Sequence, residues 1–79
     1  MSKDEIYKRL QAIFDDVFME EVRLTPELSA KDVEEWDSIT HVSLVLAIEE
    51  KFGVRFRVGE VESAKNVGDL VDLIATRAK

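Results

Sequence analysis

Apolar residues recur at intervals of three and four in three separate stretches of the chain, at residues 3–18, 38–52 and 67–77. This spacing places them along one side of a helix, so each stretch predicts an amphipathic helix. A glycine, Gly53, follows the second stretch directly and is a typical helix terminator. Ser29 to Asp32 could cap one further turn in the long connection between the first two helices.

The segment between the second and last helices has a weaker pattern. Residues 54–58 alternate as a strand would, but a lone strand has no partner in this chain, so we expect an extended connector. Residues 60–64 predict an additional, very short helix. The expected fold class is therefore all-α: a small four-helix bundle of three main helices and one short helix, in a single domain that spans residues 1–79.

The side-chain inventory argues against an enzyme. The 79 residues contain no cysteine and one histidine. Disulfides and thiolate metal sites are thereby excluded, and one histidine cannot build a typical zinc site. The three glycines are scattered, so they form no phosphate-cradling loop. The sequence therefore predicts no catalytic residues and no metal site.

The charge limits the partners that the chain could bind. The net charge is −6, which disfavours nucleic acid and anionic membranes and favours protein partners with basic patches. The N-terminus carries no apolar signal region, and no apolar run approaches the length needed to span a bilayer. We expect a cytoplasmic monomer that does not insert into membranes.

The second helix carries more apolar surface than one core requires. Asp37 or Ser38 caps its start. One stripe faces a core and comprises Leu44, Val45, Ile48 and Phe52. A second stripe, on a different arc, comprises Ile39, Val42 and Leu46. The second stripe predicts a partner-contact surface, and the alternative is a central helix buried on two sides.

The serine at the start of this helix has one useful chemical property. Free N–H groups and the helix dipole favour a phosphate at a helix N-terminus. Asp37 could hold a divalent ion or a basic residue of a modifying enzyme. From the residues alone, Ser38 is either a covalent-attachment or phosphorylation site or a simple N-cap. His41 is expected to have no catalytic role, and Trp36 is expected to be a structural anchor, with a partner contact as the alternative.

Three motifs together resemble the acyl carrier protein family. The triplet Asp37-Ser38-Ile39 opens the second helix, and Glu49-Glu50-Lys51-Phe52-Gly53 closes it. The third motif is Val67-Gly68-Asp69-Leu70. The triplet alone is weak, but the three motifs at these distances are specific, and the resemblance extends over essentially the whole chain.

The resemblance implies a carrier without catalytic activity of its own. It implies that 4′-phosphopantetheine from coenzyme A esterifies Ser38 and carries acyl groups as thioesters, which also accounts for the missing cysteine. It implies that a phosphopantetheinyl transferase recognises Asp37, directly or through the magnesium ion of that enzyme. Acyl-transferring or synthase enzymes of fatty acid or specialised, polyketide-like biosynthesis would contact the second helix. The implied contact residues are Ile39, Val42, Leu46, Glu49 and Glu50.

The chain departs from the family pattern at positions that bear on its partners. Thr40 and Ser43 stand where fatty-acid-synthesis carriers often have acidic residues, and Arg55 and Arg57 lie in a connector that is often acidic. These departures suggest a specialised carrier. An aminoacyl or peptidyl carrier and a non-carrying helical adaptor remain alternatives. Candidate residues for a cleft that shelters a short acyl group are Ile48, Phe52, Val61, Ala64 and Leu70.

Overall fold

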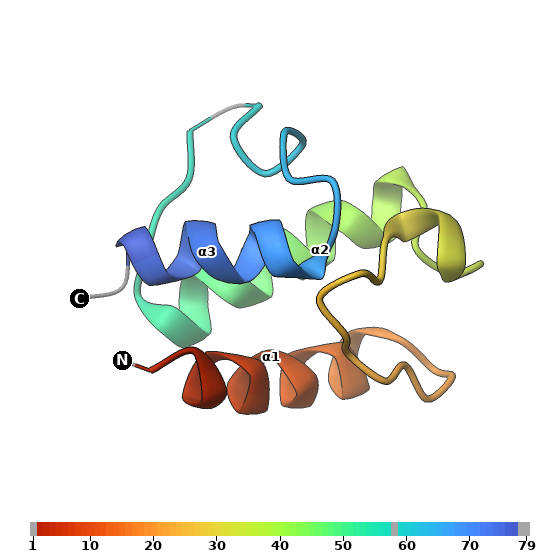
Figure 1. Cartoon of the computed structure of the whole chain (residues 1–79). Helices are drawn as coiled ribbons and strands as arrows, with labels where there is room; N and C mark the ends of the chain where they lie inside the picture. Colours follow the sequence, from red (N-terminus) through yellow and green to blue (C-terminus); the bar gives the residue numbers. More distant parts are fainter. Residues whose placement is uncertain (1, 58, 78–79) are drawn as a thin grey trace.

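The computed structural model describes residues 2–57 and 59–77, and within these residues it contains helices and no strand. Three α-helices, α1 (Lys3–Val17), α2 (Ser38–Phe52) and α3 (Val67–Arg77), form the bundle (Figure 1). One turn of 3₁₀ helix, η1 (Ala30–Asp32), lies in the long connection between α1 and α2. The predicted all-α fold with three main helices is confirmed.

The prediction of a short helix at residues 60–64 is wrong. The backbone there makes two separate turns, closed by bonds from Glu60 N to Arg57 O (3.0 Å) and from Ala64 N to Val61 O (3.0 Å). Bonds of this kind must follow one another to make a helix. The separate helical turn expected from Ser29 to Asp32 is present as η1, where these two residues form a capping box. Residues 54–57 run as the expected extended connector, and Val58 lies outside the described residues.

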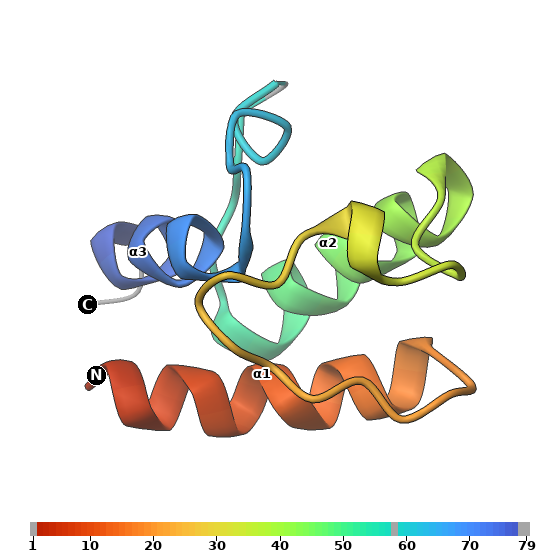
Figure 2. The same cartoon turned by 45° about the vertical axis from the view of Figure 1, so that its right-hand side comes forward.

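The hydrophobic core lies where α1 meets both other helices. Figures 1 and 2 show α1 running beneath α2 and α3, and α1 packs against each of them. The apolar stripe predicted for each helix supplies the buried side chains. The core residues on the helices are Ile6, Leu10, Ile13 and Phe14 of α1, Leu44, Ile48 and Phe52 of α2, and Val67, Leu70, Val71 and Ile74 of α3.

Three helix ends are capped by short-range hydrogen bonds or by a glycine. Ser2 Oγ accepts a hydrogen bond from Glu5 N (3.2 Å) at the start of α1. Gly53 ends α2 with φ +64°, a left-handed conformation that costs glycine little. Asn66 Oδ1 accepts from Asp69 N (2.8 Å) in the first turn of α3.

The long connection between α1 and α2 is tied to both α1 and α3. The Gln11 side chain on α1 donates to Val22 O (2.6 Å) and accepts from Leu24 N (3.2 Å). Gly68, in the first turn of α3, donates its N–H to Pro26 O (3.0 Å). A Cβ at position 68 would lie 3.1 Å from that same oxygen, so this close approach favours glycine. The connection is therefore ordered and holds its last residues in a fixed place before α2.

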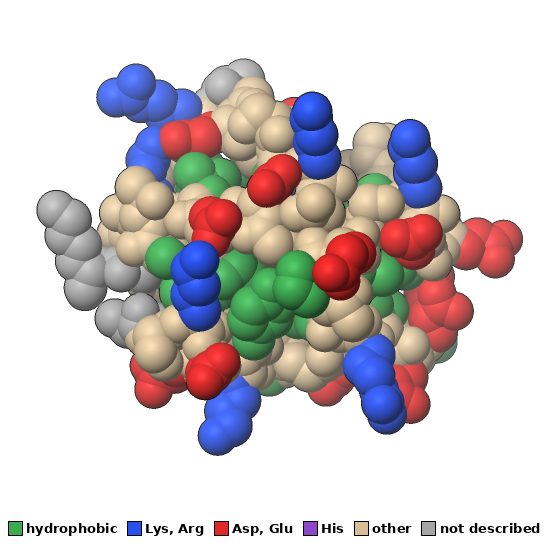
Figure 3. Space-filling model, viewed as in Figure 1, with side chains coloured by type: hydrophobic (Ala, Val, Ile, Leu, Met, Phe, Trp, Pro, Cys, Tyr) green, Lys and Arg blue, Asp and Glu red, His purple; other side chains and the backbone are tan. Residues whose placement is uncertain are grey.

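Charges of both signs cover the face of the molecule seen in Figure 1. Figure 3 shows acidic and basic side chains interspersed on this face, around a hydrophobic patch between α1 and α3. In the part of the chain that the structure describes, no helix has the length and apolar character needed to cross a bilayer.

Candidate functional site

The start of α2 is built by Asp37, which is its N-cap. Asp37 Oδ1 accepts a hydrogen bond from Thr40 N at 2.8 Å. This backbone bond, with a smaller contribution from the Thr40 side chain, lowers the pKa of the exposed Asp37 carboxyl below its usual value. The carboxylate is therefore ionised at neutral pH and already committed to the helix end.

Ser38 is the first residue of α2, and its side chain is exposed. Because Asp37 supplies the cap, the Ser38 hydroxyl is not needed for it, and among residues 2–57 and 59–77 it makes no hydrogen bond. An exposed hydroxyl on the first turn of a helix is accessible to a modifying enzyme. The positive end of the helix dipole lies beside it and favours a phosphodiester there.

Trp36 fixes the backbone immediately before this site. Its indole ring packs edge-on against Phe14 of α1, with centroids 5.4 Å apart and planes at 85°, and also contacts Phe18 at 6.0 Å. The neighbouring Glu35 carboxylate accepts hydrogen bonds from Met19 N (3.3 Å) and Glu20 N (2.9 Å). The expected role of Trp36 as a structural anchor is confirmed, and Asp37 and Ser38 are consequently held in place against α1.

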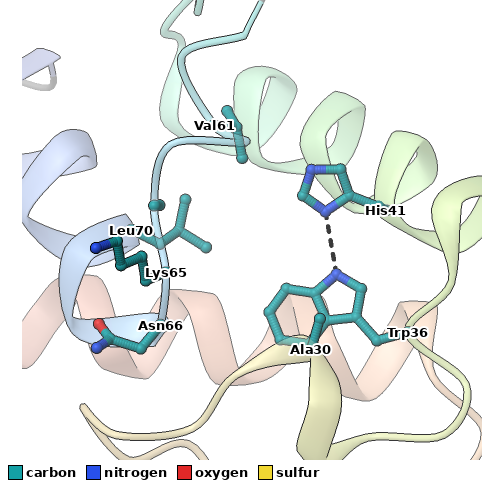
Figure 4. Close-up of a pocket in the computed structure, with 8 residues that line it drawn as sticks. Ala30, Trp36, His41, Val61, Lys65, Asn66 and Leu70 are labelled. Atoms are coloured by element: carbon teal, nitrogen blue, oxygen red, sulfur yellow. Dashed lines mark hydrogen bonds between the residues drawn. The ribbon is translucent and has the colours of Figure 1, made fainter.

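His41 pairs with Trp36 across the start of the helix. Trp36 Nε1 donates to His41 Nδ1 at 3.0 Å, and the two rings are nearly parallel (Figure 4). Nδ1 is thus committed to Trp36, and the half-buried ring lies against the tryptophan. This arrangement offers Ser38 no oriented general base of the kind that nucleophilic catalysis uses.

Two hollows lie beside these rings, and they share three lining residues. The outer one, of about 230 Å³, is lined by Asp37 and Ser38 together with Ala30, Trp36 and His41. The inner one, of about 70 Å³, shares the last three residues. Figure 4 shows Trp36 and His41 on one side of the inner hollow and the segment that leads into α3 on the other. The far wall is formed by Val61, Ala64, Lys65, Asn66 and Leu70.

The inner hollow agrees only in part with the cleft expected from the sequence. Val61, Ala64 and Leu70 line it as expected. Ile48 and Phe52 do not line it, because they lie about two and three helical turns beyond His41 along α2. Their side chains pack in the core, with exposed fractions of 0% and 9%. The hollow therefore lies nearer the start of α2 than the cleft that was expected beside Ile48 and Phe52.

The second apolar stripe of α2 is on the surface. Ile39, Val42 and Leu46 expose 79%, 57% and 60% of their area, whereas Leu44 on the core stripe exposes none. The alternative of a helix buried on both sides is wrong. The stripe begins one residue after Ser38 and continues along the helix for two turns.

The two acidic residues near the end of α2 differ in exposure to solvent. Glu50 is exposed, and Glu49 is half-buried. Glu49 Oε2 accepts a hydrogen bond from Phe56 N at 2.9 Å, which holds the extended connector against the helix. Thr40 and Ser43 leave the first two turns of α2 without an acidic side chain, and Arg55 and Arg57 are exposed as expected.

Sequence reasoning missed two contacts at this site. The Trp36–His41 pair joins the residue before the N-cap to the fourth helical residue, which is the spacing of a hydrophobic staple and could have been read from the sequence. The Glu35 bonds to residues 19 and 20 join positions far apart in the chain, and no local pattern indicates them. Within the described ranges, no cluster of His, Cys, Asp or Glu side chains could hold a metal ion.

A family model described as "Phosphopantetheine attachment site" matches residues 8–74 of the chain. The acyl carrier protein of Acidothermus cellulolyticus is 43% identical over 76 residues, covering 95% of this chain and 90% of that protein. The acyl carrier protein of Thermosynechococcus vestitus is 35% identical over 75 residues, covering 94% and 93%.

A solved structure is also similar to this chain. The solution structure of the holo acyl carrier protein from Geobacter metallireducens superimposes with a TM-score of 0.75 at 36% identity. The superposition covers 95% of this chain and 83% of that protein. The likeness therefore extends to the whole bundle, including the helix that begins at Ser38.

Proposed function

Because the chain belongs to the acyl carrier protein family, a non-catalytic family that carries 4′-phosphopantetheine covalently, we propose that Ser38 is the residue to which this group is attached. The group supplies a terminal thiol that holds an acyl chain as a thioester, which the polypeptide cannot do without cysteine. The protein thereby carries acyl intermediates between enzymes.

The observation that carries the proposal is the division of roles between Asp37 and Ser38. Asp37 caps α2, so the Ser38 hydroxyl is free and exposed at the same helix end. The hollow beside Ser38 gives an attached arm apolar and aromatic surface to lie on. These features fit a phosphodiester at Ser38 and an arm that leaves the surface or folds back along Trp36.

The exposed stripe of α2 supports the finer proposal that partner enzymes dock beside the arm. Ile39, Val42 and Leu46 form an unpartnered apolar surface that starts next to Ser38. Glu49 and Glu50 border its far end, where the basic patch of a partner would meet them. Asp37 is exposed beside Ser38, where a phosphopantetheinyl transferase would contact it directly or through that enzyme's magnesium ion.

The polar residues Thr40 and Ser43 favour a specialised carrier over one dedicated to general fatty acid synthesis. They leave the stripe's first two turns without the acidic groups that attract a strongly basic partner. We expect the double substitution Thr40→Glu and Ser43→Glu to raise the rate at which a general fatty-acid-synthesis enzyme acylates the holo protein. An unchanged rate would count against the specialised role.

The attachment itself is tested by mapping the modified residue. The protein is incubated with coenzyme A, magnesium and a broad-specificity phosphopantetheinyl transferase, then digested, and the peptides are fragmented in a mass spectrometer. We expect the phosphopantetheine mass on Ser38 and no modification in Ser38→Ala. Ser43→Ala is the matched control, because it removes another exposed serine of the same helix and should leave the modification intact. No modification of the folded protein by two unrelated transferases would favour the non-carrying adaptor.

Three further statements remain predictions from the sequence. They are the single carrier domain over residues 1–79, the cytoplasmic location and the monomeric state.

A further inference from the structure

His41 lines both the outer hollow beside Ser38 and the inner hollow next to it. Both hollows are lined by Trp36 and His41, and the inner one is closed on its far side by Val61 and Leu70 (Figure 4). A group that is attached at Ser38 and turns into the molecule therefore passes the imidazole before it reaches the apolar wall.

The Trp36 bond assigns the proton on the imidazole ring. An indole nitrogen is only a donor, so Nδ1 must present its lone pair to Trp36 Nε1, 3.0 Å away. The neutral ring then carries its proton on Nε2. His41 therefore has one N–H donor, and it lies on the side of the ring away from the tryptophan.

This donor is buried and has no partner among the residues that the structure describes. The nearest carboxylate oxygen, Glu62 Oε1, lies 3.9 Å from Nε2, which is beyond hydrogen-bond range. Buried donors in proteins are nearly always paired, and leaving one unpaired is unfavourable. Accepting the indole N–H of Trp36 uses one nitrogen of the ring, so this bond does not account for the second nitrogen.

We propose that His41 selects the cargo, by donating its Nε2–H to an oxygen substituent on a short acyl group. The inference rests on the proposed function, since the cargo reaches the hollow only from an arm on Ser38. The inner hollow of about 70 Å³ admits only a few non-hydrogen atoms, since one water needs roughly 10–15 Å³. The apolar side chains on its far wall, Val61, Ala64 and Leu70, suit a short carbon chain. The imidazole suits one oxygen, as in a 3-hydroxyacyl or 3-oxoacyl group.

Two variants separate the donor from the rest of the side chain. Asn at position 41 keeps an oxygen near the place of Nδ1, where it can accept from Trp36, but has no group at the place of Nε2. Gln at position 41 reaches further and brings an amide N–H to the place of Nε2. Glu62→Gln is a matched control, because it removes the neighbouring charge and leaves His41 intact.

The test compares two cargoes that differ by one oxygen. The holo protein is loaded with butanoyl or 3-hydroxybutanoyl, loading is verified by intact mass, and thioester hydrolysis is measured relative to the free pantetheine thioester of the same acyl group. We expect the protein to protect 3-hydroxybutanoyl about two- to tenfold more than butanoyl, the range for one hydrogen bond. His41→Asn should remove the difference, while His41→Gln and Glu62→Gln should keep it. Equal protection in the unsubstituted protein, or an unchanged difference in His41→Asn, would overturn the proposal.

A second measurement needs no variant. In the ¹⁵N-labelled protein, the His41 Nε2–H resonance should shift and exchange more slowly with 3-hydroxybutanoyl than with butanoyl. Identical spectra for the two cargoes would also overturn the proposal. Failure to load any acyl-phosphopantetheine, visible at the mass step, would instead reject the attachment at Ser38, and with it this inference.

Discussion

Two adjacent residues at the start of α2 have separate tasks. Serine and aspartate are both good N-caps, and either could have served here. Asp37 takes the role through its bond to Thr40 N, so the Ser38 side chain projects from the first turn with its hydroxyl unused. A nucleophilic hydroxyl that also capped the helix would have to break that bond before it could react.

The cap gives a prediction about stability and pH. Hydrogen bonding lowers the pKa of Asp37 in the folded state. Its contribution to stability is therefore fully present above the unfolded pKa of about 3.9 and is lost as pH falls through the lower folded pKa. We expect Asp37→Ala to lower the free energy of unfolding at pH 7, and the gap from the unsubstituted protein to narrow below pH 4.

Urea unfolding followed by Trp36 fluorescence at several pH values measures both effects. Asp37→Asn is the control, because asparagine caps equally well but does not titrate. It should remain close to the unsubstituted protein at pH 7. A gap for Asp37→Ala that stays constant from pH 7 to pH 3 would contradict the account.

At the scale of the helix, α2 has two apolar faces with different tasks. The face that includes Leu44 fills the core, and the face that includes Leu46 is open to solvent. Only the first can contribute much to stability. The second face exposes apolar side chains, which favours aggregation. Such an exposed apolar face is typical of a contact surface.

The same substitution on the two faces tests this division. Leu44→Ala removes a fully buried side chain and should cost about 2–5 kcal/mol. That is comparable with the roughly 3–5 kcal/mol of net stability expected for so small a core, so the variant should be largely unfolded at 25 °C. Leu46→Ala should change the free energy of unfolding by less than about 0.5 kcal/mol but slow acyl transfer to a partner enzyme. Equal losses of stability in urea denaturation would refute the division of faces.

The helices could be predicted closely because their signals are local. Periodicity located all three, and Gly53 marked the end of α2 to the residue. The two turns closed at Glu60 and Ala64 were harder to predict from the sequence. A short helical pattern in this segment competes with contacts to residues distant in the chain. One such contact is the pair between the Arg77 guanidinium and the Glu60 carboxylate, which joins α3 to this segment.

The position of Ser38 in the first turn of α2 was predictable, but its surroundings were only partly so. The position of Ser38 follows from the cap pattern and the family motif. The hollow depends on how the segment before α3 packs opposite Trp36 and His41, which no periodicity specifies. For that reason the sequence pattern predicts Ile48 and Phe52 at the cleft, whereas in the structure they pack in the core.

At the scale of the whole molecule, α1 organises the bundle. It packs against both other helices, contacts Trp36 through Phe14, and binds the long connection through Gln11. The residues that present Ser38 are therefore part of the same cooperative unit as the core. We expect unfolding in urea to be two-state, with coincident transitions by Trp36 fluorescence and by far-ultraviolet circular dichroism. A fluorescence transition at lower urea would show that the connection before α2 unfolds separately.

The most direct test of the carrier role is an intact-mass measurement with an acylated arm. The protein and Ser38→Ala are each incubated with acetyl-coenzyme A, magnesium and a broad-specificity phosphopantetheinyl transferase, and each product is then treated with hydroxylamine, which cleaves thioesters. We expect the protein to gain one acetyl-phosphopantetheine group and to lose the acetyl group alone on treatment, and we expect no gain in Ser38→Ala. A gain that persists in Ser38→Ala, or an unmodified folded protein with every transferase tried, would contradict this account.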